Sequence, residues 1–169
     1  MKKKNLIIII AVIIVVIVSI LLIVLLNKNK KHEFVEIVEI NYSYGGGFGT
    51  IVDTATKTLT FTPDGEVKMS NSYNSYTDTF TIDQSKYKEL NEFISDRISL
   101  FDKKAKEDND VMDGGSYRIS IKLKNGETKS IGGYMIRNKE FIEIKEEILN
   151  IIDIEKLNKY TKTLRSMAE

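Results

Sequence analysis

The 169-residue chain contains no cysteine and no tryptophan, and it has one histidine and one proline. The lack of cysteine excludes disulfides, thiolate nucleophiles and cysteine-ligated metals. The only histidine, His32, lies in a lysine-rich stretch near the N-terminus, and we interpret it as a linker residue. A Ser-His-Asp triad and a site with several histidine ligands are therefore excluded from the rest of the chain.

Charge is nearly balanced over the whole chain, with a formal value of +1, but it is unevenly distributed. Residues 1–31 contain six of the 25 basic residues and none of the 24 acidic ones. The remainder has 19 basic against 24 acidic residues, which gives it a formal charge of −5. A net-acidic domain without a basic stripe is unsuited to nucleic acid, so we expect no nucleic-acid partner.

Residues 6–26 form an uninterrupted apolar run whose only polar side chain is Ser19. As a helix this run would be roughly 31 Å long, which matches a hydrocarbon core of about 30 Å. A cleaved signal peptide would have an apolar region of about 7–15 residues and a small-x-small cleavage site. Because the run is longer and has no small residues near its end, it predicts an uncleaved transmembrane signal-anchor in contact with membrane lipid.

The apolar run divides the chain into parts. We expect a cytoplasmic tail at 1–5, the transmembrane helix at 6–26 and a basic linker at 27–33. An extracytoplasmic domain follows at 34–153, with a C-terminal amphipathic helix at 154–169. Three lysines lie on each side of the span, but a short basic tail is usually retained in the cytoplasm. We therefore expect a single-pass protein of the cell membrane with its domain outside.

Alternating apolar and polar residues after position 34 predict several strands. The first carries Val38, Ile40, Tyr42 and Tyr44 on one face. Further strands are expected at 58–62, 66–69, 76–82, 117–123 and 128–131. We expect Gly132-Gly133 to break or bend the last of these, with 134–136 as its continuation.

Two turns have clear chemistry. Pro63-Asp64-Gly65 is typical of a three-residue hairpin loop, and Asn125-Gly126 is a strong hairpin signal. If Thr62 pairs with Glu66, the first turn places four apolar residues on one buried face. These residues are Leu59, Phe61, Val67 and Met69.

Apolar residues at helical spacing predict a helix at about 84–101, capped by Asp83, and another that runs to about 152, capped by Asn138. The segment 154–167 continues as a second amphipathic helix beyond a bend near Asp153. The chain therefore has the α+β class: a transmembrane helix, then an antiparallel sheet of about five or six strands with two or three helices on one face.

Residues 44–50, a glycine-rich stretch, resemble a phosphate-binding loop only superficially. Such a loop needs a Gly-Lys-Ser/Thr ending that leads into a helix. Here the lysine is missing and the following residues suggest a strand, so we interpret the stretch as a strand connection or bulge.

The acidic segment 107–114 contains Asp108, Asp110 and Asp113. Counted from Asp108, the spacing fails the EF-hand pattern, because position 12 is Ile119 instead of glutamate. We interpret the segment as a solvated loop, with a weak calcium site at the three aspartates as the alternative. No other metal and no cofactor are expected.

Tyrosine, serine and asparagine are concentrated at 70–76, a mixture that adaptable binding loops use. Tyr73, Asn74 and Tyr76 are therefore candidate binding residues, and an ordinary hairpin loop with one packed tyrosine is the alternative.

The combined features favour a membrane-anchored, non-catalytic binding domain with a protein or cell-surface partner. One alternative is a tethered hydrolase that cleaves a cell-surface polymer with two carboxylates about 5–9 Å apart. Another is an accessory subunit of a membrane complex, docked through its span or through an exposed apolar stripe on the last helix. No residue is assigned a catalytic role.

Overall fold

The computed structural model describes residue 13 and residues 15–19, 35–47, 49–108, 110 and 114–168. They belong to two separate units, divided between Phe34 and Val35. In the first unit the described residues are helical, and the Ser19 hydroxyl donates to the Val15 carbonyl at 2.8 Å. None of the described helices is long and apolar enough to cross a membrane. Most of the span predicted at 6–26 lies outside the described residues.

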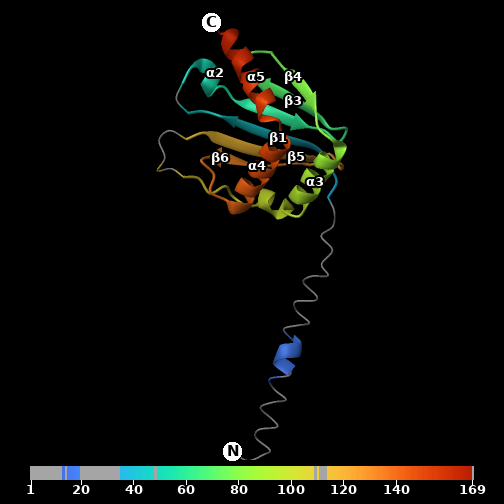
Figure 1. The fold of residues 1–169 in the computed structure, drawn as a ribbon. Helices are drawn as coiled ribbons and strands as arrows, with labels where there is room; N and C mark the ends of the chain where they lie inside the picture. The colour runs from blue at the N-terminus through green and yellow to red at the C-terminus, as the bar shows by residue number, and fades with distance from the viewer. Residues whose placement is uncertain are drawn as a thin grey trace, which may run out of the picture. The chain divides into compact units, whose positions relative to one another are not determined.

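The second unit has the predicted α+β class. Its sheet has six antiparallel strands in the order β4-β3-β2-β1-β5-β6 (Figure 1). The strands are β1 (Ile37–Gly45), β2 (Lys57–Phe61), β3 (Glu66–Asn71), β4 (Asp78–Thr81), β5 (Ser116–Leu123) and β6 (Thr128–Tyr134).

Three longer helices pack against the sheet, and Figure 1 shows them gathered on the same side of it. They are α3 (Gln84–Ser95), α4 (Lys139–Ile151) and α5 (Ile154–Ser166). A four-residue helix, α2 (Ile51–Thr54), connects β1 to β2, and a 3₁₀ turn, η1 (Ile98–Asp102), follows α3. The sheet with helices on one face is thus as the sequence predicted.

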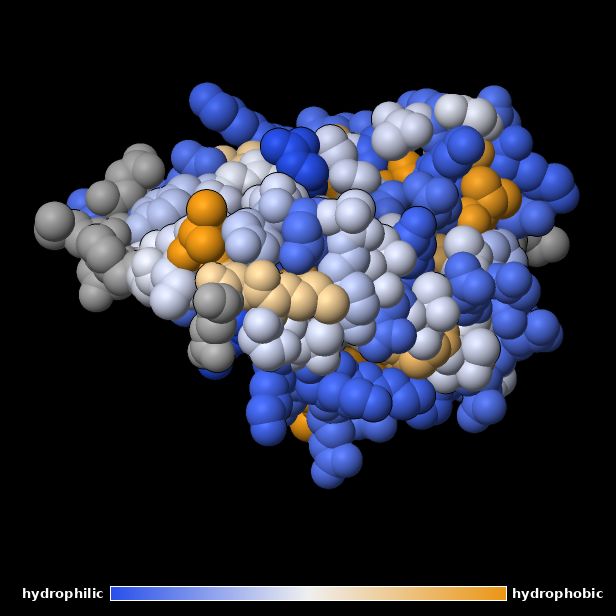
Figure 2. Space-filling view, turned by 90° about the horizontal axis from the view of Figure 1, so that it is seen from above, coloured by the Kyte–Doolittle hydropathy of each residue, from blue (hydrophilic) through white to orange (hydrophobic). Residues whose placement is uncertain are grey.

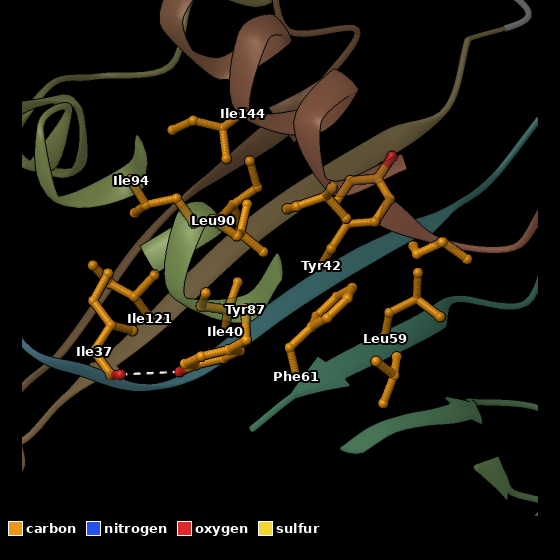
Figure 3. Close-up of a cluster of buried hydrophobic side chains, with 14 of the residues drawn as sticks. Ile37, Ile40, Tyr42, Leu59, Phe61, Tyr87, Leu90, Ile94, Ile121 and Ile144 are labelled. Carbon is orange, nitrogen blue, oxygen red and sulfur yellow. Dashed lines mark hydrogen bonds between the residues drawn. The ribbon is translucent and has the colours of Figure 1, made fainter. Parts of the chain in front are cut away.

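The core lies between the helices and the apolar face of the sheet (Figure 3). Strand residues that alternate with polar ones are buried there, because successive side chains of a strand point to opposite faces. Both α4 and α5 contribute fully buried side chains. Members of the core include Ile40, Leu59, Phe61, Val67, Ile119, Ile121, Leu90, Ile94, Ile144, Tyr160 and Leu164.

The hairpin at Pro63-Asp64-Gly65 has the predicted register. Phe61 lies opposite Val67, and Leu59 lies opposite Met69. Gly65 has a φ of 86°, and a Cβ at this position would collide with the Ile82 carbonyl oxygen. Glycine is therefore required for both its backbone conformation and its closeness to the strand end.

The predicted inward face of β1 is wrong at its first position. We expected Val38, but Ile37 is buried at 1% exposure and Val38 is only half-buried. A register shift between Ile37 and Glu39 in the pairing with β5 adds one residue to β1. Such a bulge reverses the alternation locally, which a strict period of two cannot anticipate.

Three further predictions need correction. The residues after the glycine-rich stretch form α2 and not a strand. The helix predicted at 84–101 ends at Ser95, and its last part is the separate turn η1. Finally, β6 runs unbroken through Gly132-Gly133 to Tyr134, because both glycines keep their pairing with β5.

Candidate binding surface

The face of the sheet opposite the helices is polar, and we call it the open face. It carries one hydrogen-bonding side chain from every strand in a single row across the sheet. From β4 to β6 the row consists of Thr79, Lys68, Thr60, Asn41, Ser120 and Ser130. A neighbouring row consists of Ser70, Thr58, Ser43 and Arg118.

The open face follows from the same alternation that builds the core. In β2, Thr58 and Thr60 lie between the buried residues Lys57, Leu59 and Phe61. All open-face side chains of the two rows are half-buried or exposed. Among the described residues, the core helices bury the other face of the sheet. Figure 2 views the molecule from above, not onto the open face, and shows hydrophilic and intermediate residues over most of that side, with hydrophobic ones in separate spots.

Hydrogen bonds between side chains hold the centre of the open face in place. The hydroxyls of Ser43 and Thr58 lie 2.9 Å apart. Thr60 donates to the Asn41 side-chain oxygen at 2.6 Å, and the Asn41 amide donates to Glu39 at 2.7 Å. The two cross-strand pairs and the bond within β1 restrain these side chains, so the donors and acceptors at the centre of the surface are preorganised.

Arg118 is the exposed cation of the second row. Its side chain lies over Gly132, where an added Cβ would come within 2.8 Å of the Arg118 Cβ. The guanidinium approaches the Ser130 hydroxyl at 3.5 Å and forms no ion pair with any described residue. Gly132 therefore provides the space that the arginine stem occupies.

A cavity of about 340 Å³ opens at the end of the open face near β5 and β6. Its lining is rich in hydroxyl groups and includes Ser43, Thr56, Ser116, Tyr134 and Arg118. The Tyr134 hydroxyl accepts from the Gly114 backbone at 2.7 Å, and the Tyr134 backbone donates to Glu107 at 2.9 Å. This end of the face therefore offers both a hollow and oriented polar groups.

The three tyrosine-loop candidates lie in a tight turn organised by Asn71. The Asn71 side-chain oxygen accepts from the backbones of Tyr73 and Asn74, both at 2.9 Å. Its amide donates to the Tyr160 hydroxyl at 2.9 Å, and the Tyr76 ring stacks on Tyr160 at 5.4 Å. The loop is thus fastened to α5, and much of its hydrogen-bonding capacity is used within the protein.

The acidic-loop candidates are only partly described. Asp108 is buried and forms an ion pair with Arg137, and its other oxygen accepts from the Asp110 backbone at 3.3 Å. Asp113 lies outside the described residues. No group of three or more histidine, cysteine or acidic residues suited to a metal occurs in the described part of the chain.

The structure adds one charged cluster that the sequence did not indicate. Arg165 of α5 donates two hydrogen bonds to Asp53 of α2, the shorter at 2.6 Å. Together with the Thr50 cap of α2, Arg165 lowers the pKa of Asp53 to about 2. Nearby, the buried Lys57 donates to the Val52 carbonyl at 3.0 Å, and burial lowers the pKa of this lysine. The cluster attaches α2 to the C-terminal helix.

No protein-family model matches this chain, and no curated protein matches it. The function of the domain therefore has to be inferred from its own residues. The open face was not predicted as a site, although its residues are the polar halves of the strand patterns. Their alternation was visible in the sequence, but their alignment into rows depends on the pairing of distant strands.

Proposed function

We propose that this chain is a single-pass membrane-anchored protein whose α+β domain lies outside the cytoplasm and acts by binding. The apolar run at 6–26 is the anchor, and the open face of the sheet is the binding surface. The partner is a polar component of the cell surface, either a protein or a polymer.

The observation that carries the proposal is the row of polar side chains from all six strands. Hydroxyl, amide and charged groups stand at strand spacing on a rigid sheet, and hydrogen bonds already order the central ones. A partner that binds there pays little entropy for ordering the surface. Lys68, Arg118, Glu39 and Glu66 supply charges of both signs, which suits a polar interface.

Photo-crosslinking in intact cells tests the binding surface. A photoreactive residue is placed in the full chain at Thr60 or Ser120 on the open face, and at the exposed Glu146 of α4 as a control. We expect Thr60 and Ser120 to crosslink to the same partner and Glu146 to crosslink to none. Equal crosslinking from Glu146, or none from the open face, would contradict the proposal.

Protease accessibility tests the topology separately. Protease added to intact cells should digest the domain, because the short basic tail at 1–5 favours retention of the N-terminus inside. Complete protection until the membrane is opened would place the domain in the cytoplasm.

A further inference from the structure

The two edge strands of the sheet, β6 and β4, differ in how far other segments cover them. At the β6 edge, η1 lies close by, and Lys129 of β6 donates to Asp102 at 2.7 Å. Beyond β6, Glu107 forms a bridge with Ile136. At the other edge, no described segment pairs with the outer side of β4. The β4 edge is therefore an unpaired strand within the described part of the protein.

The pairing of β3 fixes which backbone groups of β4 point outward. The Thr62 backbone donates to Glu66 at 3.1 Å, and the Ile82 backbone donates to Gly65 at 2.9 Å. In an antiparallel ladder the hydrogen-bonded pairs alternate, so Phe80 and Asp78 direct their backbone groups toward β3. The N–H and C=O groups of Thr79 and Thr81 consequently face away from the sheet.

A groove runs along this edge, lined by residues of β3 and β4 and by lysines of α5. Two cavities of about 440 and 370 Å³ share Phe80, Thr81 and Lys156 as lining residues. Lys156 of α5 lies over the Phe80 ring, with its Nζ 4.7 Å from the ring centroid. The helix layer thus extends past the last strand, and the groove occupies the space where side chains of a seventh strand would lie.

The charges of the groove are self-complementary. The larger cavity is lined by two acids, Glu66 and Asp78, and by two lysines, Lys156 and Lys159. The acids belong to the strands and the lysines belong to α5. A two-fold axis through the edge would place the lysines of one copy across the seam from the acids of the other.

We propose that β4 pairs antiparallel with β4 of a second copy of this chain, about a two-fold axis at Phe80. In this register Phe80 lies opposite Phe80 of the second copy, and Thr79 lies opposite Thr81. The outward backbone groups of Thr79 and Thr81 then form the hydrogen-bonded pairs, as the alternation requires. Two six-stranded sheets join into one of twelve strands with a closed, isologous interface.

Pairing of the two β4 strands would break one hydrogen bond that forms within the single chain. The Asp78 carboxylate accepts from the Thr79 backbone N–H at 2.9 Å, so it occupies an edge donor that the second strand needs. Pairing frees this carboxylate for the lysines of the other copy. With four residues per strand the interface is small, so self-association is expected only at roughly micromolar concentrations or above.

Cysteine crosslinking tests the register directly, because the chain has no cysteine of its own. Thr79→Cys and Thr81→Cys variants of the full chain are purified in a mild detergent, mixed and oxidised. Opposed residues in this register have Cα atoms roughly 5.5 Å apart, within reach of a disulfide. The mixture should crosslink at least tenfold faster than either variant alone, since neither cysteine lies opposite itself. Equal rates in all three samples would overturn the register.

Light scattering tests the association. The wild-type full chain should change from one copy to two as its concentration rises. Thr81→Pro removes one outward N–H, and Asp78→Lys places like charges across the seam; each should remain a single copy while keeping its cooperative melt. A wild-type chain that stays monomeric at the highest concentration, or a dimer unchanged in both variants, would overturn the proposal.

Discussion

The Tyr87 hydroxyl of α3 donates a 2.9 Å hydrogen bond to the Ile37 carbonyl of β1, fifty positions earlier in the chain (Figure 3). Ile37 lies at the bulge of β1, where the ladder with β5 is interrupted. The Asn91 amide donates to the same carbonyl at 3.3 Å. Two side chains of α3 therefore satisfy a buried carbonyl at the bulge, and they position the helix over the sheet.

Tyr87→Phe should lower the free energy of unfolding by about 1 kcal/mol, the usual net value of one hydrogen bond. The loss is modest because Asn91 still donates to Ile37. Urea unfolding of the variant and the wild type measures this difference in the free energy of unfolding. A loss above about 3 kcal/mol would mean that Asn91 does not compensate.

Tyr87 should also make the stability of the domain fall at alkaline pH. Burial raises the pKa of Tyr87 above its ordinary value of about 10. The unfolded chain then releases the phenol proton at a pH where the folded protein still holds it. The stabilising contribution is complete below pH 10 and declines as the pH rises further. Tyr87→Phe should therefore show a shallower decline of the melting temperature above pH 10 than wild type, and identical slopes would contradict this.

Phe61→Ala should destabilise the domain by about 3–5 kcal/mol, because the ring is fully buried between sheet and helices. Thr60→Ala, the matched control on the open face, should cost about 1 kcal/mol through its lost hydrogen bond to Asn41. Chemical unfolding compares the two variants. Similar small losses at both sites would contradict the burial of Phe61.

The ion pair between Asp53 and Arg165 should contribute stability that acid removes. The pKa of Asp53 is lowered to about 2, against about 4 in an unfolded chain. The contribution is therefore present above pH 4 and is lost as the pH falls toward 2. Arg165→Gln should lower the melting temperature at pH 6, and the difference from wild type should shrink toward pH 2. Lys162→Gln, an exposed charge on the same helix, should show no such narrowing.

Sequence patterns predicted the parts of the fold that depend on neighbouring residues. Pro63-Asp64-Gly65 and Asn125-Gly126 predicted two hairpins, since turn chemistry and strand alternation act over a few residues. The bulge at Ile37 could not be predicted, because its carbonyl is satisfied by Tyr87 and Asn91 from a distant helix.

The start of α4 and the short helix α2 also depend on contacts between distant residues. Asn138 holds the N-cap position of α4, as expected, but its side-chain oxygen accepts from the Lys106 backbone at 2.6 Å and makes no capping hydrogen bond. The helix α2 was missed, because four residues are too few for a periodic pattern and its stability comes from Thr50, Lys57 and Arg165. Contacts of this kind link residues that only the folded chain brings together.

Calcium and chelator should leave the melting temperature of the full chain unchanged. Asp108 is buried and paired with Arg137, so a cation would have to displace the guanidinium before it reached this carboxylate. A calcium site at a hundredfold excess of calcium over its dissociation constant would add about 2.7 kcal/mol to the free energy of unfolding, which raises the melting temperature by several degrees for a domain of this size.

Arg137→Gln serves as the matched variant. The substitution leaves Asp108 buried without its ion-pair partner and should lower the melting temperature. If the aspartates can coordinate a cation, added calcium should raise the melting temperature of this variant part of the way back. A calcium-dependent rise of several degrees in the wild-type protein would instead show that the segment around Asp108 and Asp110 binds the ion despite the ion pair.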